Sequence, residues 1–198
     1  MTTVTARAIC GLVQPLSGQV RFSDVELQRL RAHQIRQLGL VYLPEGRGIF
    51  STMSVLDNLR MAVRWIRPKS ARLEALEQAY QMFPILHRRK NQVASSLSGG
   101  EQQMLSVASG LAMKPKLLIA DELSLGLAPK AVDTVIEALN QARQAGVSVL
   151  LIEQYVTRAL AFADRALIMQ KGTVRWSGST DAASEAVIEH YWATTAQE

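Results

Sequence analysis

The sequence predicts an α/β protein with a mainly parallel sheet, and two patterns carry this prediction. Short apolar runs at residues 40–43 (LVYL), 117–120 (LLIA) and 147–152 (VSVLLI) have the length and composition of strands buried on both faces. Segments with apolar residues at helical spacing alternate with these runs, as between Pro129 and Gly146. Strands alternating with helices form parallel sheets, because each helix returns the chain to the start of the next strand.

The N-terminal part is expected to contain a helix, a strand and a second helix. Apolar spacing predicts the first helix over residues 2–13, and Pro15 and Gly18 mark the turn after it. Residues 19–22 are expected to form a short strand. The second helix is expected over residues 27–38, ended by Gly39.

Residues 54–91 show helical patterns only. Ser54 is expected to cap one helix, Pro68 to break it, and Ser70 to start another that runs toward Met82. Since strand patterns lie on both sides of this stretch, we expect a helical subdomain, residues 54–91, inserted in the core of a single domain that spans residues 1–198.

A glycine-containing helix start lies at residues 98–101. Ser98 and Glu101 match an S-x-x-E capping box, which satisfies the first free amides of the helix. Gly99 and Gly100 each cost about 1 kcal/mol relative to alanine in a helix, which indicates that something approaches the backbone closely. Free amides at a helix N-terminus favour an anion such as a phosphate.

Asp121 and Glu122 follow the apolar run at residues 117–120. A carboxylate at the tip of a buried strand suits holding Mg²⁺ through its water shell, and the next one suits orienting or deprotonating an attacking water. Two solvated loop acids are the alternative interpretation. The spacing from the helix start at residues 98–101 favours phosphate chemistry.

The C-terminal part is expected to add smaller elements. A helix is expected over residues 129–145 and a short one over 156–163. A strand at residues 166–169 and another at 173–176 are expected around a turn at Lys171 and Gly172. A last helix is expected over about residues 182–192.

Composition restricts the function classes. Net charge is +5, but the basic residues are scattered apart from residues 87–90, which favours solvated surface over a nucleic-acid patch. The single cysteine, Cys10, excludes a disulfide within the chain and favours a reducing compartment. No apolar run reaches the ~18 residues of a membrane span.

The motifs, taken in order, resemble those of the ATP-binding subunits of ABC transporters. Residues 97–103 (LSGGEQQ) resemble the signature motif, residues 117–121 the Walker B strand, and residues 124–128 (SLGLA) the D-loop that crosses the dimer interface. The resemblance implies a P-loop NTPase-like ABC ATPase domain that uses ATP and Mg²⁺. It implies a catalytic role for Glu122 and metal binding by Asp121. The implied nucleotide-binding residues are Ser98, Gly99, Gly100 and Glu101.

Residues 41–59 (VYLPEGRGIFSTMSVLDNL) resemble the branched-chain amino-acid uptake branch of this family, in which PEGR occupies the place of the Q-loop. The resemblance therefore places Glu45 at the Q-loop position and Gln154 at the position of the switch histidine. Gln154 can donate a hydrogen bond to a γ-phosphate, but it cannot gain a charge as histidine does. The alternative is that both are ordinary loop residues.

The sequence departs from the family in its first residues. The G-x-x-x-x-G-K-[ST] loop, whose amides and lysine cradle phosphates, is absent from the 198 residues. Counting back from Gly11 places Thr3 at the Mg²⁺-binding position of that loop and Thr2 at the lysine. Leu123 replaces the proline usual after the catalytic glutamate. We therefore expect an N-terminally truncated ABC ATPase domain that binds ATP poorly by itself and does not turn it over.

The resemblance also implies partners. These are a second ABC ATPase subunit, in a homo- or heterodimer, and membrane permease subunits docked on residues 54–91, which places the chain peripherally on the cytoplasmic face of the cell membrane. Branched-chain amino acids are the implied cargo, and urea or amides are the alternative, because related uptake systems for them carry similar ATPases. A non-catalytic truncated remnant that acts as a binding partner is one alternative. A soluble ABC ATPase acting on nucleic acid or ribosomes is another, against which the PEGR and EQ motifs argue, so that no nucleic acid is expected.

Overall fold

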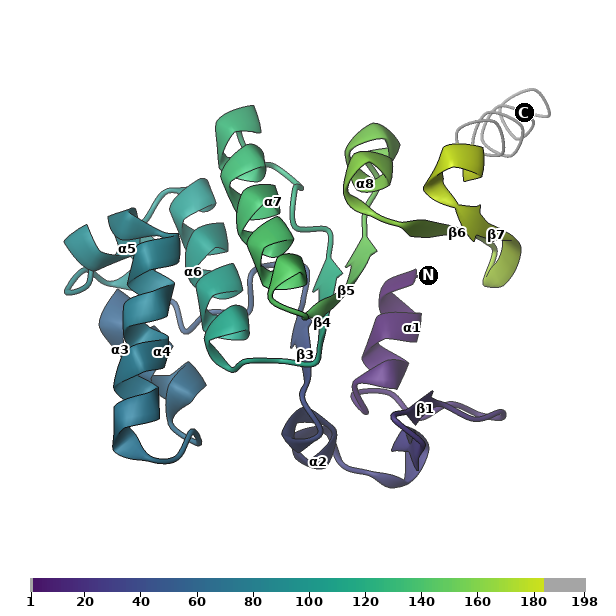
Figure 1. Cartoon of the computed structure of the whole chain (residues 1–198), viewed down its shortest axis with the longest axis horizontal. Helices are drawn as coiled ribbons and strands as arrows, with labels where there is room; N and C mark the ends of the chain where they lie inside the picture. The colour runs from purple at the N-terminus through teal and green to yellow at the C-terminus, as the bar shows by residue number, and fades with distance from the viewer. Residues whose placement is uncertain (1, 184–198) are drawn as a thin grey trace.

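The computed structural model describes residues 2–183 and places helices on both faces of a parallel sheet (Figure 1). Within that range the sheet consists of β3 (Leu40–Leu43), β4 (Leu117–Asp121) and β5 (Ser148–Ile152), hydrogen-bonded in the order β3-β4-β5. Both pairings are parallel. The predicted α/β class is confirmed, and parallel pairing brings the carboxyl ends of the strands to one edge.

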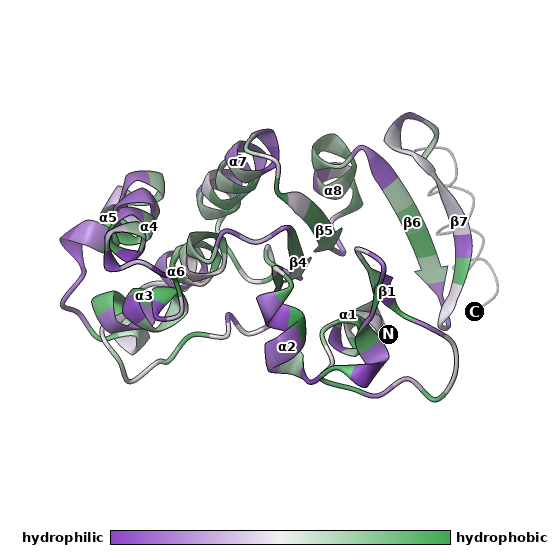
Figure 2. Cartoon of the chain, turned by 60° about the horizontal axis from the view of Figure 1, so that its bottom comes forward, coloured by the Kyte–Doolittle hydropathy of each residue, from purple (hydrophilic) through white to green (hydrophobic). Residues whose placement is uncertain are grey.

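Among the described residues, α1 (Thr2–Ile9) and α2 (Ala32–Gln37) cover one face of the sheet, and α6 (Gly99–Ala112) and α7 (Pro129–Gln144) cover the other. Side chains alternate between the faces along a strand. Leu118 and Ala120 of β4 therefore pack in the core under α6 and α7. Ile119, which lies between them, packs in the smaller core under α1 and α2. The strands β4 and β5 are the apolar centre of the molecule (Figure 2).

Three further helices lie on the side of α6 that is remote from the sheet (Figure 1). They are α3 (Val55–Val63), α4 (Lys69–Met82) and α5 (Pro84–Arg88). A β-bridge between Ser54 and Val93 brings the two ends of this segment together. The arrangement supports the expected inserted subdomain at residues 54–91, which stays a prediction. Within residues 2–183, no helix has both the length and the apolar character needed to cross a membrane.

The helix expected over residues 27–38 is wrong as a single element. A 3₁₀ helix (Leu27–Arg29) comes first, and α2 begins only at Ala32. Arg31 between them is extended (φ −77°, ψ 153°), and its amide donates to the Gln34 side chain at 2.9 Å. The Gln34 side chain thus accepts the hydrogen bond from the Arg31 amide, which in a continuous helix over residues 27–38 would donate to a backbone carbonyl.

Other boundaries near the N-terminus also shift. Helix α1 ends at Ile9 rather than at residue 13, because Gly11 adopts a left-handed φ of 68°. The strand expected at residues 19–22 is reduced to β1 (Arg21–Phe22), which pairs antiparallel with the unexpected strand β2 (Val25–Glu26).

For the helical segment, one prediction is confirmed, one needs correction, and the structure adds a helix that was not predicted. Ser54 caps α3 as expected, its Oγ accepting from the Asp57 amide at 3.0 Å. Helix α4 starts at Lys69, so Ser70 lies inside it rather than at its start. The short helix α5 was not predicted; Pro84 stands in its first turn, where a missing amide costs nothing.

The strand β5 is less buried than its composition predicts. Residues 149–152 are only partly buried, because within residues 2–183 this strand pairs with β4 alone. The expected elements after it are found as α8 (Val156–Phe162), β6 (Arg165–Gln170) and β7 (Thr173–Ser179). The last two form a separate antiparallel hairpin. The last predicted helix, 182–192, lies almost entirely outside the described residues.

Candidate functional site

The carboxyl edge of the sheet gathers most of the residues singled out in the sequence. The chain leaves β3 into residues 44–48, leaves β4 into residues 122–128 and leaves β5 into residues 153–154. Because the three strands are parallel, these loops lie at the same edge. Ligands of open α/β sheets bind at this edge.

Asp121, the last residue of β4, is completely buried, and both of its carboxylate oxygens accept hydrogen bonds. The Thr3 hydroxyl donates to Oδ1 at 3.3 Å, and the Tyr42 hydroxyl donates to Oδ2 at 2.8 Å. Burial and the hydrogen bond to Asp121 hold the pKa of Tyr42 well above its ordinary value, so the phenol stays a donor. The two residues predicted to bind metal, Thr3 and Asp121, are therefore neighbours.

The donors at this position fit Mg²⁺. A hydroxyl and a carboxylate are hard oxygen ligands, and Mg²⁺ is commonly held by one or two such groups with water and phosphate in its other positions. The described residues contain no group of three or more His, Cys, Asp or Glu side chains that could hold a metal ion by themselves. A divalent ion here would depend on Asp121, Thr3 and a phosphate-bearing ligand.

Glu122 and Gln154, which the sequence assigned to catalysis, are in contact. The Gln154 amide donates from Nε2 to Glu122 Oε1 at 3.0 Å. Glu122 adopts a left-handed φ of 51°, which is unfavourable for a residue with a Cβ. Its amide donates to the Ile152 carbonyl at 2.8 Å, so the pairing of β4 with β5 extends one residue beyond β4.

Sequence reasoning missed Glu153. Its carboxylate accepts from the Ser124 amide at 3.0 Å through Oε1 and from the Ser124 hydroxyl at 2.7 Å through Oε2. Ser124 is the first residue of the stretch that resembles the D-loop. A signal was available, because an acid directly after an apolar strand in a parallel sheet lies at the ligand edge.

The predicted capping box at the start of α6 is confirmed. The Glu101 amide donates to Ser98 Oγ at 3.3 Å, and the Ser98 amide donates to Glu101 Oε2 at 2.8 Å. Arg89 adds an ion pair with Glu101 at 2.8 Å. Burial raises the pKa of Glu101, but the Ser98 hydrogen bonds and the Arg89 guanidinium outweigh it and hold the pKa below its ordinary value. Arg89, from the basic run assigned to solvated surface, is thus an exception within that run.

The close approach predicted at Gly99 and Gly100 exists within the chain itself. A Cβ on Gly99 would lie 3.0 Å from the Arg47 guanidinium and 3.9 Å from Leu127 Cδ2. A Cβ on Gly100 would lie 2.8 Å from the Cβ of Ala131 in α7. The glycines therefore let α6 pack against the D-loop region and α7, whatever else approaches them.

Arg47 links the Q-loop position to the start of α6. It has a left-handed φ of 76°, and its guanidinium donates to Gln102 Oε1. Gln102 in turn donates from Nε2 to the Leu97 carbonyl at 3.1 Å. Glu45, two residues before Arg47, is exposed to solvent at this edge. The structure thus joins the loop at residues 45–48 to α6 through Arg47 rather than through Glu45.

Comparison with known proteins identifies the family. The family model described as "ABC transporter" matches residues 2–124. The branched-chain amino acid transport ATP-binding protein BraG of Pseudomonas aeruginosa is 39% identical over 166 residues, which cover 84% of this chain and 71% of BraG. The probable branched-chain amino acid transport ATP-binding protein LivF of Archaeoglobus fulgidus is 32% identical over 185 residues, which cover 93% of this chain and 76% of LivF. The lipopolysaccharide export ATP-binding protein LptB of Escherichia coli is 31% identical over 86% of this chain and 71% of LptB.

Solved structures agree on the fold. The dimeric post-hydrolysis state of the ATP-binding cassette MJ0796 bound to ADP and Pi superposes with a TM-score of 0.80 at 19% identity, covering 90% of this chain and 80% of that one. A structure described as the ATP-binding subunit of an ABC transporter has a TM-score of 0.80 at 23% identity, covering 93% and 76%. From the family match, its curated relatives and the fold, we conclude that this chain belongs to the ABC transporter ATP-binding family.

Proposed function

We propose that this chain is an ATP-binding subunit of an ABC importer for branched-chain amino acids. The observation that carries the proposal is its 39% identity to BraG over 84% of the chain. The PEGR stretch at residues 44–47 and Gln154 support the same branch. They favour uptake over lipopolysaccharide export, the process named in the description of LptB, which is 31% identical to this chain.

The acidic half of the site would act on the phosphates of ATP. Asp121 and Thr3, 3.3 Å apart, would hold Mg²⁺ through its water shell, and that ion would neutralise phosphate charge. Glu122 would orient or deprotonate the attacking water. Gln154 would donate to the γ-phosphate from the amide that now contacts Glu122. Glu45, at the Q-loop position, would face the same ligand from the β3 side.

The helix α6 half would act on an ATP held by another subunit. The free amides at residues 99–101 and the Ser98 hydroxyl lie at a helix N-terminus, which attracts phosphate. A polypeptide of these 198 residues has no G-x-x-x-x-G-K-[ST] loop, so this half is the one that it would contribute by itself. A second ABC ATPase subunit would supply the phosphate cradle.

The remaining partners follow from the same assignment. Permease subunits would dock on the helices of residues 54–91, and the chain would then lie peripherally on the cytoplasmic face of the cell membrane. A reconstituted complex of the chain with permease subunits would test this docking. Loss of the chain from the membrane fraction when residues 54–91 are replaced is the expected result, and retention would contradict it.

A nucleotide titration tests the intrinsic activity. We expect the purified chain to bind a fluorescent ATP analogue in the presence of Mg²⁺ with a dissociation constant above the micromolar range. The phosphates of the analogue would meet no lysine and no glycine-rich loop in these 198 residues. An Asp121→Asn variant serves as the comparison. A micromolar dissociation constant for the wild-type chain, together with loss of binding in Asp121→Asn, would contradict the expected weak ATP binding. It would show that Asp121 and its neighbours bind a nucleotide within this chain.

A complementation assay tests the α6 half. The partner would be an ABC ATPase subunit that has its own phosphate loop but a disabled signature motif, so that hydrolysis requires the signature of this chain. We expect ATP hydrolysis with the wild-type chain and none with its Gly99→Asp variant. Aspartate in the first turn suits the helix dipole and lies near Arg47, so the variant is expected to fold. Equal hydrolysis with both would contradict the proposal.

The second candidate is a non-catalytic binding partner. A polypeptide limited to these 198 residues has no phosphate loop, and such a polypeptide fits this candidate better than an independent ATPase. It predicts that the chain binds the partner subunit without raising its ATP hydrolysis. The complementation assay therefore separates the two candidates.

A further inference from the structure

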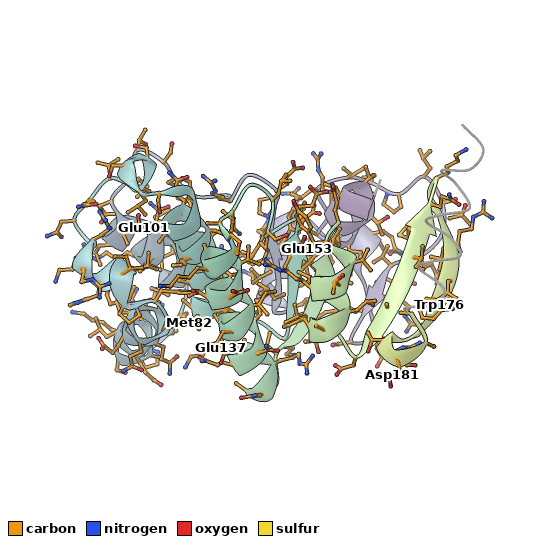
Figure 3. All side chains as sticks on the ribbon, turned by 90° about the horizontal axis from the view of Figure 1, so that it is seen from above. Met82, Glu101, Glu137, Glu153, Trp176 and Asp181 are labelled. Atoms are coloured by element: carbon orange, nitrogen blue, oxygen red, sulfur yellow. The ribbon has the colours of Figure 1, made fainter. Side chains whose placement is uncertain are left out.

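Four hydrogen bonds join residues 122–124, which follow β4, to residues 152–154, at the end of β5 and just after it. The Glu122 amide donates to the Ile152 carbonyl at 2.8 Å. The Ser124 amide and hydroxyl donate to the two oxygens of Glu153 at 3.0 and 2.7 Å. Gln154 then donates to Glu122 at 3.0 Å. Glu153, which is labelled in Figure 3, is half-buried and directly follows the last residue of β5.

The bonds between Glu153 and Ser124 are buried at the Ser124 end and half-buried at the Glu153 end. Ser124 is 7% exposed and its neighbour Leu123 is 3% exposed. A hydrogen bond to a charged group contributes about 1.5–3 kcal/mol, and a buried donor left unpaired costs a comparable amount. Glu153 therefore holds a buried amide and a buried hydroxyl that no other described side chain satisfies.

The loop needs such an anchor because it leaves β4 through a strained residue. Glu122 adopts a φ of 51°, which turns the chain sharply between the buried Asp121 and the buried Leu123. The position of Ser124 therefore sets the direction in which the Glu122 carboxylate points. It also decides the course of residues 124–128, whose Leu127 lies against Gly99 at the start of α6.

We propose that Glu153 is a positioning residue, which sets the placement of Glu122 and of residues 124–128 through its two hydrogen bonds to Ser124. This inference rests on the proposed function, because residues 124–128 would face the ATP site of the partner subunit. Glu153 touches no substrate in this scheme. It acts through Ser124, and the neighbouring Gln154 acts on Glu122 directly.

Hydrogen exchange of the whole chain tests the anchor without any partner. The variants are Glu153→Ala, Glu153→Gln and Ser124→Ala. Glu137→Ala is the matched control, because Glu137 bonds Gln141 on the exposed side of α7 (Figure 3). We expect exchange of the 122–128 amides to rise about tenfold or more in Glu153→Ala, since local opening sets this rate.

The conservative variant makes the measurement specific. In Glu153→Gln the side-chain carbonyl can accept from the Ser124 backbone amide, and the side-chain NH2 group can donate to the Ser124 hydroxyl oxygen. Exchange of the 122–128 amides should therefore stay within about threefold of wild type. Equal protection of these amides in wild type and Glu153→Ala would overturn the proposal.

The complementation assay supplies the readout that a merely stabilising contact would not change. At a temperature where all variants are folded, we expect Glu153→Ala to lower the maximal rate of hydrolysis about tenfold or more, with the half-saturating ATP concentration unchanged, because ATP binding depends on the partner's phosphate loop. Glu153→Gln should restore the rate, and Glu137→Ala should not affect it. A wild-type rate with Glu153→Ala would overturn this inference and leave the proposed function intact. If the wild-type chain itself supports no hydrolysis, the proposed function fails, and the exchange measurement alone decides the role of Glu153.

Discussion

The Tyr42 hydroxyl donates to a carboxylate oxygen of Asp121 at 2.8 Å, from β3 to the end of the adjacent strand β4. Asp121 has no exposed surface, so the hydroxyls of Tyr42 and Thr3 replace water as hydrogen-bond donors to its carboxylate oxygens. A buried carboxylate without donors is very unfavourable. This contact therefore stabilises the fold at the position where we propose that Mg²⁺ is bound.

Replacement of Tyr42 by phenylalanine should destabilise the chain. The Tyr42→Phe variant leaves one oxygen of a buried carboxylate without a donor, which is expected to lower the free energy of unfolding by about 2 kcal/mol. Urea unfolding at neutral pH measures it. Tyr155→Phe is the control, because Tyr155 is 58% exposed and should change stability by less than about 0.5 kcal/mol. Equal stability of the two variants would contradict the role of this hydrogen bond.

Glu101 should make stability depend on pH. Its pKa is lower in the folded chain than its ordinary value, so the folded state binds this proton less readily than the unfolded state. Its contribution is therefore present above the ordinary pKa and is lost as the pH falls through the lowered one. Wild type should exceed Glu101→Gln in stability by about 1 kcal/mol at neutral pH.

Urea unfolding between neutral and acid pH measures this difference. It should shrink as the pH falls through the folded pKa of Glu101, because both proteins then carry a neutral side chain at this position. Glu137→Gln is the control, since Glu137 is exposed and bonds only its helical neighbour Gln141. A wild-type advantage over Glu101→Gln that stays constant into acid would contradict the assignment.

The two glycines of α6 should respond differently to alanine. Gly100→Ala places a Cβ 2.8 Å from the Cβ of Ala131, between two helices that cannot easily move apart. Such overpacking costs about 1–3 kcal/mol. The only tight contact of the Cβ in Gly99→Ala is with the end of the Arg47 side chain, and the variant gains up to about 1 kcal/mol of helix propensity. Thermal unfolding compares the variants. Equal losses would show that the space around Gly99 is as rigid as that around Gly100.

The chain should be more stable with glycine at position 122 than with alanine. Both Glu122→Gly and Glu122→Ala lose the contact with Gln154, so their difference reports the backbone alone. At a φ of 51° we expect glycine to be favoured by about 1 kcal/mol. The same pair of changes at Glu137, inside α7, should favour alanine by a similar amount. Opposite signs at the two positions confirm the strain, whereas the same sign would contradict it.

Local sequence patterns predicted the elements whose stability is local. The S-x-x-E box located the start of α6 at Gly99, because capping depends on residues within one turn. Pro129 likewise located the start of α7. The apolar runs predicted β3, β4 and β5, since strands buried in a parallel sheet need little besides apolar side chains.

Predictions were wrong where a distant or unexpected partner decided the outcome. Residues 27–38 have helical periodicity, but the Gln34 side chain satisfies the Arg31 amide and the helix breaks there. The strand β5 has the composition of a buried strand, but its burial depends on neighbours, and within the described residues it has one. A periodic pattern contains no information about either partner.

The candidate site divides in the same way. The sequence placed Asp121 and Glu122 at the end of an apolar strand, and the family resemblance pointed to Thr3 and Gln154 as candidate site residues. Only the tertiary structure decided that Tyr42 bonds Asp121 and that Glu153 bonds Ser124, 29 residues away. The physical reason is that parallel pairing aligns strand ends far apart in sequence. A buried polar group bonds whichever donor that alignment brings within reach, and the sequence of either strand alone does not specify it.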